Sequence, residues 1–130
     1  MEGAPVTAPN WEGKTILIGE DELVNLKLLE MILVKTKARI IHGSSGLEVL
    51  NHFKNNPDVA IILMDIKMPE MDGIEAAQEI RKLNSVIPII AQTAYALEDE
   101  KKRCVEAGFS GYVTKPINRK ELLALIQSFF

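Results

Sequence analysis

The chain has 130 residues, a length typical of one domain with a single hydrophobic core. The net charge of −3 gives no basic surface for nucleic acid, and no apolar run approaches the roughly 20 residues of a membrane span. The single cysteine, Cys104, excludes an internal disulfide and fits a reducing cytoplasm. We therefore expect one cytoplasmic domain at 14–130. It follows a linker or leader at 1–13, which lacks the features of a signal peptide and which Trp11 attaches to the domain.

Apolar strand-like runs alternate with segments of helical period along the chain. The runs predict five strands, at 15–18, 39–42, 59–65, 87–91 and 111–113. The segments between and after them predict five helices, at 22–36, from Ser45 through Phe53, at 73–83, at 97–107 and after Asn118. Ser45 with Glu48 and Asn118 with Glu121 have the spacing of helix-capping pairs. This alternation predicts an α/β fold, a parallel sheet with helices on both faces.

Polar side chains follow four of the predicted strands. Glu20 and Asp21 follow the first, Asp65 ends the third, Thr93 follows the fourth and Lys115 follows the fifth. In such sheets ligands bind beyond the carboxyl ends of the strands, so we expect these groups to share one crevice. Carboxylates this close repel one another, and a hard cation such as Mg²⁺ relieves the repulsion.

This set of side chains also suits covalent phosphate chemistry. The Asp65 carboxylate is ionised at neutral pH and can attack phosphorus to form an acyl phosphate. The cation and Lys115 would offset the charge of the phosphoryl oxygens, and the Thr93 hydroxyl would bind one of them. Taken alone, Asp65 could equally be a carboxylate that caps a turn or a helix.

Four fragments, in order and at family spacing, resemble the receiver domain of response regulators in two-component signalling. They are Ile16 to Asp21 with Asn25, Leu63 to Gly73, Thr93-Ala94, and Tyr112 to Pro116. The resemblance covers about Lys14 to Phe130. It implies a doubly wound, five-stranded parallel sheet in the flavodoxin-like order 2-1-3-4-5. It also implies a cis peptide bond between Lys115 and Pro116.

The resemblance assigns roles to the residues at the strand ends. Asp65 is expected to accept the phosphoryl group, and Lys115 to bind it. Asp21, Asp65, the backbone carbonyl of Lys67 and, through water, Glu20 are expected to hold Mg²⁺, with Mn²⁺ as an alternative. The metal-binding pair is Glu-Asp here, where many relatives have Asp-Asp.

The resemblance also implies a conformational switch. Thr93 is the expected switch hydroxyl and Tyr112 the switch aromatic, and both would change the surface of the fourth helix, fifth strand and fifth helix. That surface could also pair two copies of the chain. Lys67 and Tyr95 occupy positions that flank the path of the hydrolytic water in the family. Since neither would hold that water well, we hypothesise slow self-dephosphorylation.

The expected partner is a phosphohistidine on a histidine kinase or a histidine phosphotransfer domain. The first helix would dock it, with Leu23, Leu26 and Lys27 as candidate contacts. The domain would then be a phosphorelay switch rather than an enzyme in its own right, and it would contact neither nucleic acid nor membrane. The leader resembles the junction before a receiver in a hybrid histidine kinase, of which the chain could be a part.

Other functions fit the residues less well. A phosphate-ester hydrolase with an aspartyl phosphate usually has a second aspartate where Lys67 stands. A flavin module would need a phosphate-binding loop where Glu20 and Asp21 stand, and a dinucleotide site would need a Gly-x-Gly-x-x-Gly turn. A receiver-like interaction module that takes no phosphate remains the alternative, and the complete set of site residues argues against it.

Overall fold

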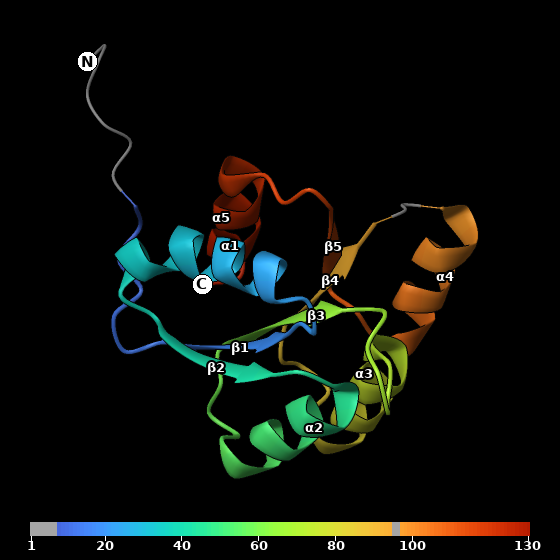
Figure 1. Ribbon diagram of the computed structural model, residues 1–130. Helices are drawn as coiled ribbons and strands as arrows, with labels where there is room; N and C mark the ends of the chain where they lie inside the picture. Colours follow the sequence, from blue (N-terminus) through green and yellow to red (C-terminus); the bar gives the residue numbers. More distant parts are fainter. Residues whose placement is uncertain (1–7, 95–96) are drawn as a thin grey trace.

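Residues 8–94 and 97–130 of the computed structural model form a parallel sheet with helices on both faces (Figure 1). Five strands lie in the order β2-β1-β3-β4-β5, which confirms the predicted fold and strand order. The elements are β1 (Thr15–Gly19), α1 (Leu23–Leu33), the 3₁₀ turn η1 (Val34–Thr36), β2 (Arg39–Gly43), α2 (Gly46–Asn55), β3 (Ile61–Asp65), α3 (Gly73–Leu83), β4 (Ile89–Thr93), α4 (Glu98–Ala107), β5 (Gly111–Thr114) and α5 (Arg119–Gln127).

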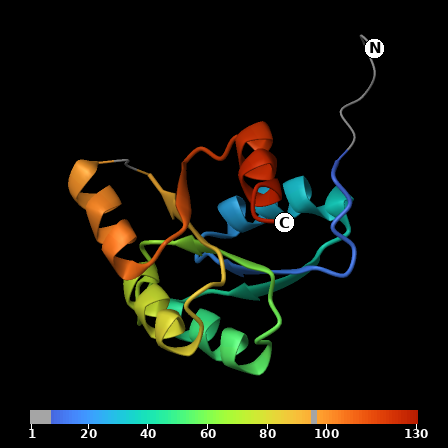
Figure 2. The ribbon, with the colours of Figure 1, turned by 180° about the vertical axis from the view of Figure 1, so that it is seen from behind.

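The hydrophobic core has two layers, one on each face of the sheet. Helices α1 and α5 cover one face, and α2, α3 and α4 cover the other, as the two opposite views show (Figures 1 and 2). Strand β3 lies between β1 and β4, and all five of its residues are buried. A strand buried on both faces must be apolar throughout, which explains the unbroken run before Asp65.

Three helices begin at side chains that satisfy free backbone donors. Each cap accepts a hydrogen bond from the backbone N–H three residues later: Ser45 from Glu48 (3.1 Å), Asp72 from Glu75 (2.8 Å) and Asn118 from Glu121 (3.0 Å). The first and third pairs were predicted. The Asp72 cap fixes the start of α3 directly after the loop that follows Asp65.

Two strands begin later than the sequence predicts. The strand expected at 59–65 begins at Ile61, and the strand expected at 87–91 is β4, Ile89–Thr93. Pro88 lies before β4, where its carbonyl accepts a hydrogen bond from Ile62 N (3.0 Å). Proline has no N–H to give to the ladder, so regular pairing begins after it. The shift makes Thr93 the last residue of β4 rather than a residue that follows it.

The segment before β1 packs onto the domain through Trp11. The indole is 2% exposed, its Nε1 donates to Gln127 Oε1 (2.8 Å), and its ring meets Phe130 edge-on at 5.0 Å between centroids. Trp11 N also donates to Thr36 O (2.7 Å). Trp11 therefore joins the segment before the sheet to the end of α5, while the expected boundary at residue 14 stays a prediction.

Candidate functional site

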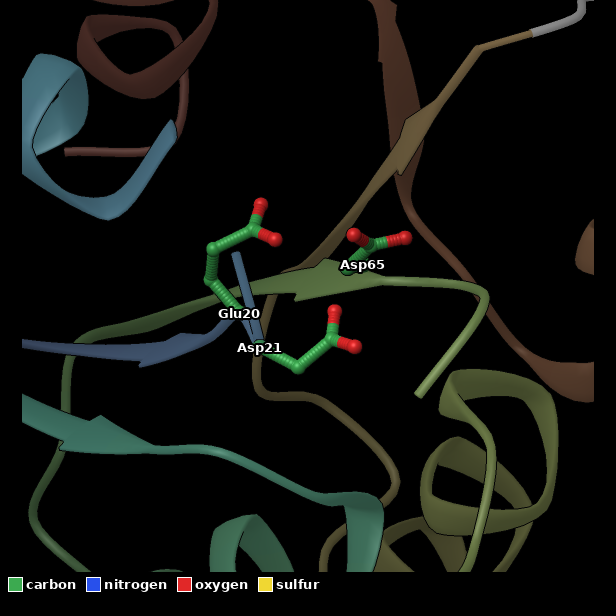
Figure 3. Close-up of side chains that lie close together, drawn as sticks. All are labelled: Glu20, Asp21 and Asp65. Carbon is green, nitrogen blue, oxygen red and sulfur yellow. The ribbon is translucent and has the colours of Figure 1, made fainter. Parts of the chain in front are cut away.

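Three carboxylates meet at the carboxyl ends of β1 and β3. Glu20 and Asp21 follow β1 and Asp65 ends β3, and Figure 3 shows their side chains gathered at this edge of the sheet. One oxygen of each lies within 4.8 Å of the others. Glu20 and Asp65 are buried, whereas Asp21 is exposed. Three acidic groups this close, one of them open to solvent, are a donor set that fits a hard divalent cation.

Glu20 is held in place by hydrogen bonds to its carboxylate and to its backbone. The side-chain amide of Asn25, on α1, and the backbone N–H of Glu22 (3.1 Å) both donate to the carboxylate. His42 Nε2 lies 2.7 Å from the Glu20 carbonyl oxygen, so the His42 ring is hydrogen-bonded to the backbone of the acidic pair. Burial raises the pKa of the Glu20 carboxyl above its ordinary value, against the effect of the two donors, and the charge of Asp65 adds to the rise.

Lys115 brings positive charge to these carboxylates. Its Nζ lies 2.7 Å from Asp65 Oδ2, 3.4 Å from Glu20 Oε1 and 3.7 Å from Glu22 Oε1. Burial lowers the pKa of Lys115, but the hydrogen bond and charge of Asp65, together with Glu20, outweigh burial and raise it above its ordinary value. Lys115 therefore stays protonated at neutral pH. The peptide bond between Lys115 and Pro116 is cis, as predicted.

Asp65 lies in a pocket of about 310 Å³ that opens beyond the sheet. Its Oδ1 accepts a hydrogen bond from Lys67 N (3.0 Å), and its Oδ2 contacts Lys115. The pocket wall also includes Asp21, Thr93 and Glu100. The Thr93 side chain is 7% exposed, and its hydroxyl donates to the Glu100 carboxylate at the start of α4. The sheet thus brings a carboxylate, an ammonium and a hydroxyl together in one pocket.

The sequence matches known proteins over almost all of the folded chain. Residues 16–127 match the response regulator receiver domain. The chain belongs to this family. Its curated relatives include hybrid kinases: the chain is 34% identical to hybrid signal transduction histidine kinase I of Dictyostelium discoideum and 36% identical to signal transduction histidine-protein kinase BarA of Escherichia coli K12. The alignments cover 97% and 94% of this chain but only 8% and 13% of those proteins, so the chain corresponds to about a tenth of their length.

Solved receiver domains have the same architecture. The receiver domain of sensor histidine kinase PA1611 from Pseudomonas aeruginosa is 34% identical, with a TM-score of 0.83 over 90% of this chain and 97% of that one. That protein was crystallised with a magnesium ion coordinated in its active site cleft. The Vibrio cholerae chemotaxis protein CheY4, at 22% identity and a TM-score of 0.84 over 90% of this chain, shares the fold. Among residues 8–94 and 97–130, no helix of this receiver is long and apolar enough to cross a membrane.

The structure places most of the predicted site residues around one pocket of the receiver. The residues that line this pocket include Asp21, Asp65, Lys67, Thr93 and Lys115. The buried Glu20 side chain lies beside them, 3.4 Å from Lys115 Nζ. Tyr112 lies apart on β5, where it is 44% exposed and its ring centroid is 5.1 Å from Lys101 Nζ on α4. Tyr95 lies outside the described residues.

The sequence did not predict the contacts that three further residues of the receiver make at or beside the site. Glu22 lies just before α1, where an acidic residue is common for the helix alone, yet it pairs with Lys115. Glu100 belongs to the charged run at 98–103, a pattern typical of a solvated helix face, yet it accepts a hydrogen bond from Thr93. Gln92 is fully buried: its Oε1 accepts from Asn25 (3.3 Å), and its Nε2 has no partner within the described part of the chain. The sequence offered one signal for Gln92: a glutamine near the end of an otherwise apolar strand, where a polar side chain needs a polar site.

Proposed function

We propose that this receiver is a phosphorelay switch in which Asp65 accepts a phosphoryl group from a phosphohistidine. The observation that carries the proposal is the contact of the Asp65 carboxylate with Lys115 at 2.7 Å, inside a pocket that also contains Asp21 and Thr93. A buried carboxylate beside a fixed cation is an ionised nucleophile with charge stabilisation already in place.

In the transfer, a carboxylate oxygen of Asp65 bonds to phosphorus as the phosphorus–nitrogen bond of the donor breaks. The released imidazole nitrogen takes up a proton from solvent. Lys115 stays protonated and pairs with the phosphoryl oxygens. Bound Mg²⁺, or Mn²⁺, would be held by Asp21, Asp65, the Lys67 carbonyl and Glu20, and would neutralise further negative charge on the phosphoryl group. The fit rests on the three carboxylate oxygens that lie within 4.8 Å of one another.

The donor domain would dock on the outer surface of α1. Leu26, one of the expected contacts, is 8% exposed and packs in the core, so it is not available to a partner. Leu23 and Lys27 are exposed as expected. The apolar side chains that α1 and η1 present to solvent are Leu23, Val24, Leu28, Met31 and Val34. We call this set the α1 surface, and we propose that a histidine kinase or phosphotransfer domain binds it.

Phosphorylation would change the surface formed by α4, β5 and α5. The new phosphoryl oxygens compete for the Thr93 hydroxyl, and Tyr112 on β5 responds. This surface is also our candidate for pairing two copies of the chain. We further propose that the domain works in the cytoplasm as part of a hybrid histidine kinase and is not an enzyme by itself. Slow self-dephosphorylation stays a prediction, since Tyr95 lies outside the described residues.

A phosphorylation assay tests the proposed function. The protein is incubated with acetyl phosphate and Mg²⁺, and the phosphorylated fraction is separated on a phosphate-binding gel. We expect phosphorylation of the wild type and none of Asp65→Asn, because the amide is not a nucleophile. Asp58→Asn is the matched control, since Asp58 is exposed and lies in the turn before β3. An unphosphorylated wild type would favour the interaction module, and equal labelling of both aspartate variants would exclude Asp65.

A further inference from the structure

The switch hydroxyl has a carboxylate partner on α4. Thr93 ends β4, and its Oγ1 donates to the side chain of Glu100, in the first turn of α4. Both residues line the pocket that contains Asp65 and Lys115. A hydroxyl has one proton to donate, and an ionised acceptor binds it more strongly than a neutral one. While the Thr93 proton is bonded to Glu100, it is not bonded to an oxygen on Asp65.

We propose that Glu100 is a positioning residue that holds the Thr93 hydroxyl in the unphosphorylated state and opposes its engagement by the phosphoryl group. This inference rests on the proposed function. A phosphoryl group on Asp65 brings acceptor oxygens and negative charge into the pocket that Glu100 lines. The oxygens compete for the Thr93 proton, and the charge repels the Glu100 carboxylate. Both effects favour the transfer of the Thr93 hydrogen bond from Glu100 to the phosphoryl group.

The position of Glu100 also links the two switch residues. The next residue, Lys101, places its Nζ 5.1 Å from the centre of the Tyr112 ring. The first turn of α4 therefore contacts Thr93 through Glu100 and Tyr112 through Lys101. When Glu100 leaves Thr93, the helix can move, and the contact between Lys101 and Tyr112 changes with it. If Glu100 were only a solvated residue, a change of partner at Thr93 would not be passed to Tyr112 through α4.

The test follows the Thr93 methyl resonance by NMR in protein labelled at threonine methyl groups. Four proteins are compared: wild type, Glu100→Ala, Glu100→Asp and Glu106→Ala. The aspartate keeps the negative charge but is one methylene shorter, so it separates reach from charge. Glu106 is the matched control because it is exposed on the same helix. Spectra are recorded first without ligand, and then during titration with beryllium fluoride and Mg²⁺ as a phosphoryl mimic.

We expect both Glu100 variants to shift the unliganded Thr93 resonance toward its position in the mimic-bound wild type. We also expect both to bind the mimic about two- to tenfold more tightly, the factor for losing one hydrogen bond. Glu106→Ala should match the wild type in both measurements. Unchanged Thr93 resonances, or an effect in Glu100→Ala that Glu100→Asp does not share, would overturn the proposal.

Failure of the proposed function gives a different result. In that case the wild type itself does not bind the mimic, which contradicts phosphoacceptance at Asp65. The unliganded spectra still decide the Glu100 contact: a Thr93 shift in both Glu100 variants and none in Glu106→Ala supports it, and no shift overturns it.

Discussion

Single residues at the carboxyl end of the sheet set the charge of the site. Glu20, Asp21 and Asp65 lie within 4.8 Å of one another, and Lys115 contacts two of them. The protein therefore has an excess of negative charge where a cation would bind. Burial raises the pKa of the Glu20 carboxyl, which makes this residue sensitive to pH in the folded state.

The raised pKa of Glu20 predicts how stability depends on pH. A carboxyl that binds its proton more tightly when folded contributes stability below the unfolded pKa, ordinarily 4.5, and loses that contribution as pH rises through the folded pKa. We expect the free energy of unfolding of the wild type, minus that of Glu20→Gln, to fall as pH rises above 4.5 without metal. Urea denaturation in a chelating buffer measures this difference.

Metal and a control variant complete the Glu20 test. Added Mg²⁺ should reverse the trend, because a bound cation favours the ionised carboxylate. Glu30→Gln is the control, since Glu30 is exposed on α1, away from the acidic pair. If the free energy of unfolding of the wild type, minus that of Glu20→Gln, grows with pH in the chelating buffer, the prediction is contradicted.

At the scale of elements, α1 shows where the sequence pattern was insufficient. The helix is apolar on most of its surface, so spacing alone could not tell which leucines face the core. Packing on β1 and α5 buries Leu26, Leu29 and Leu33 and leaves Val24 and Met31 in solvent. An exposed apolar strip on a helix is a typical place for a partner domain.

If the α1 surface docks the donor domain, a change on it should slow transfer from a protein phosphodonor but not from a small-molecule phosphodonor. We expect Val24→Ser to slow phosphoryl transfer from a phosphorylated histidine phosphotransfer domain by roughly tenfold, which corresponds to about 1.4 kcal/mol of lost contact energy. The rate with acetyl phosphate should not change, because Val24 does not line the pocket. Rapid-quench measurements with each donor give both rates.

Val86→Ser is the matched control for the α1 surface. Val86 is 82% exposed, close to the 84% of Val24, and it lies before β4, far along the chain from α1. Equal slowing by both variants, or slowing of both donors by Val24→Ser, would show that the α1 surface is not the docking site.

At the scale of the whole molecule, the parallel sheet is what makes distant residues into one site. The apolar runs predicted the strands, and the rule that parallel strands present their carboxyl ends at one edge predicted that Asp21, Asp65, Thr93 and Lys115 would meet. The contact of Thr93 with Glu100 could not be predicted, because it depends on how α4 packs. Gln92 was missed for a similar reason, since Asn25, which donates a hydrogen bond to its side chain, is on α1 rather than on β4.

Trp11 tests how far the folded unit extends before β1. Its indole is 2% exposed and bonded to Gln127, so Trp11→Ala should lower the free energy of unfolding by about 3 kcal/mol. Trp11→Phe keeps a ring against Phe130 and should cost less. Urea denaturation followed by circular dichroism measures both. A loss below about 1 kcal/mol for Trp11→Ala would place Trp11 in the linker, outside the cooperative unit.

Identifying the phosphorylated residue tests the central claim most directly. The protein is phosphorylated with acetyl phosphate and Mg²⁺ and reduced with borohydride, which converts an aspartyl phosphate to homoserine, and the peptides are sequenced by mass spectrometry. We predict homoserine at position 65 in the wild type and none in Asp65→Asn. Homoserine at another aspartate, or a stable phosphate on Thr93, would contradict the claim that Asp65 is the phosphoacceptor.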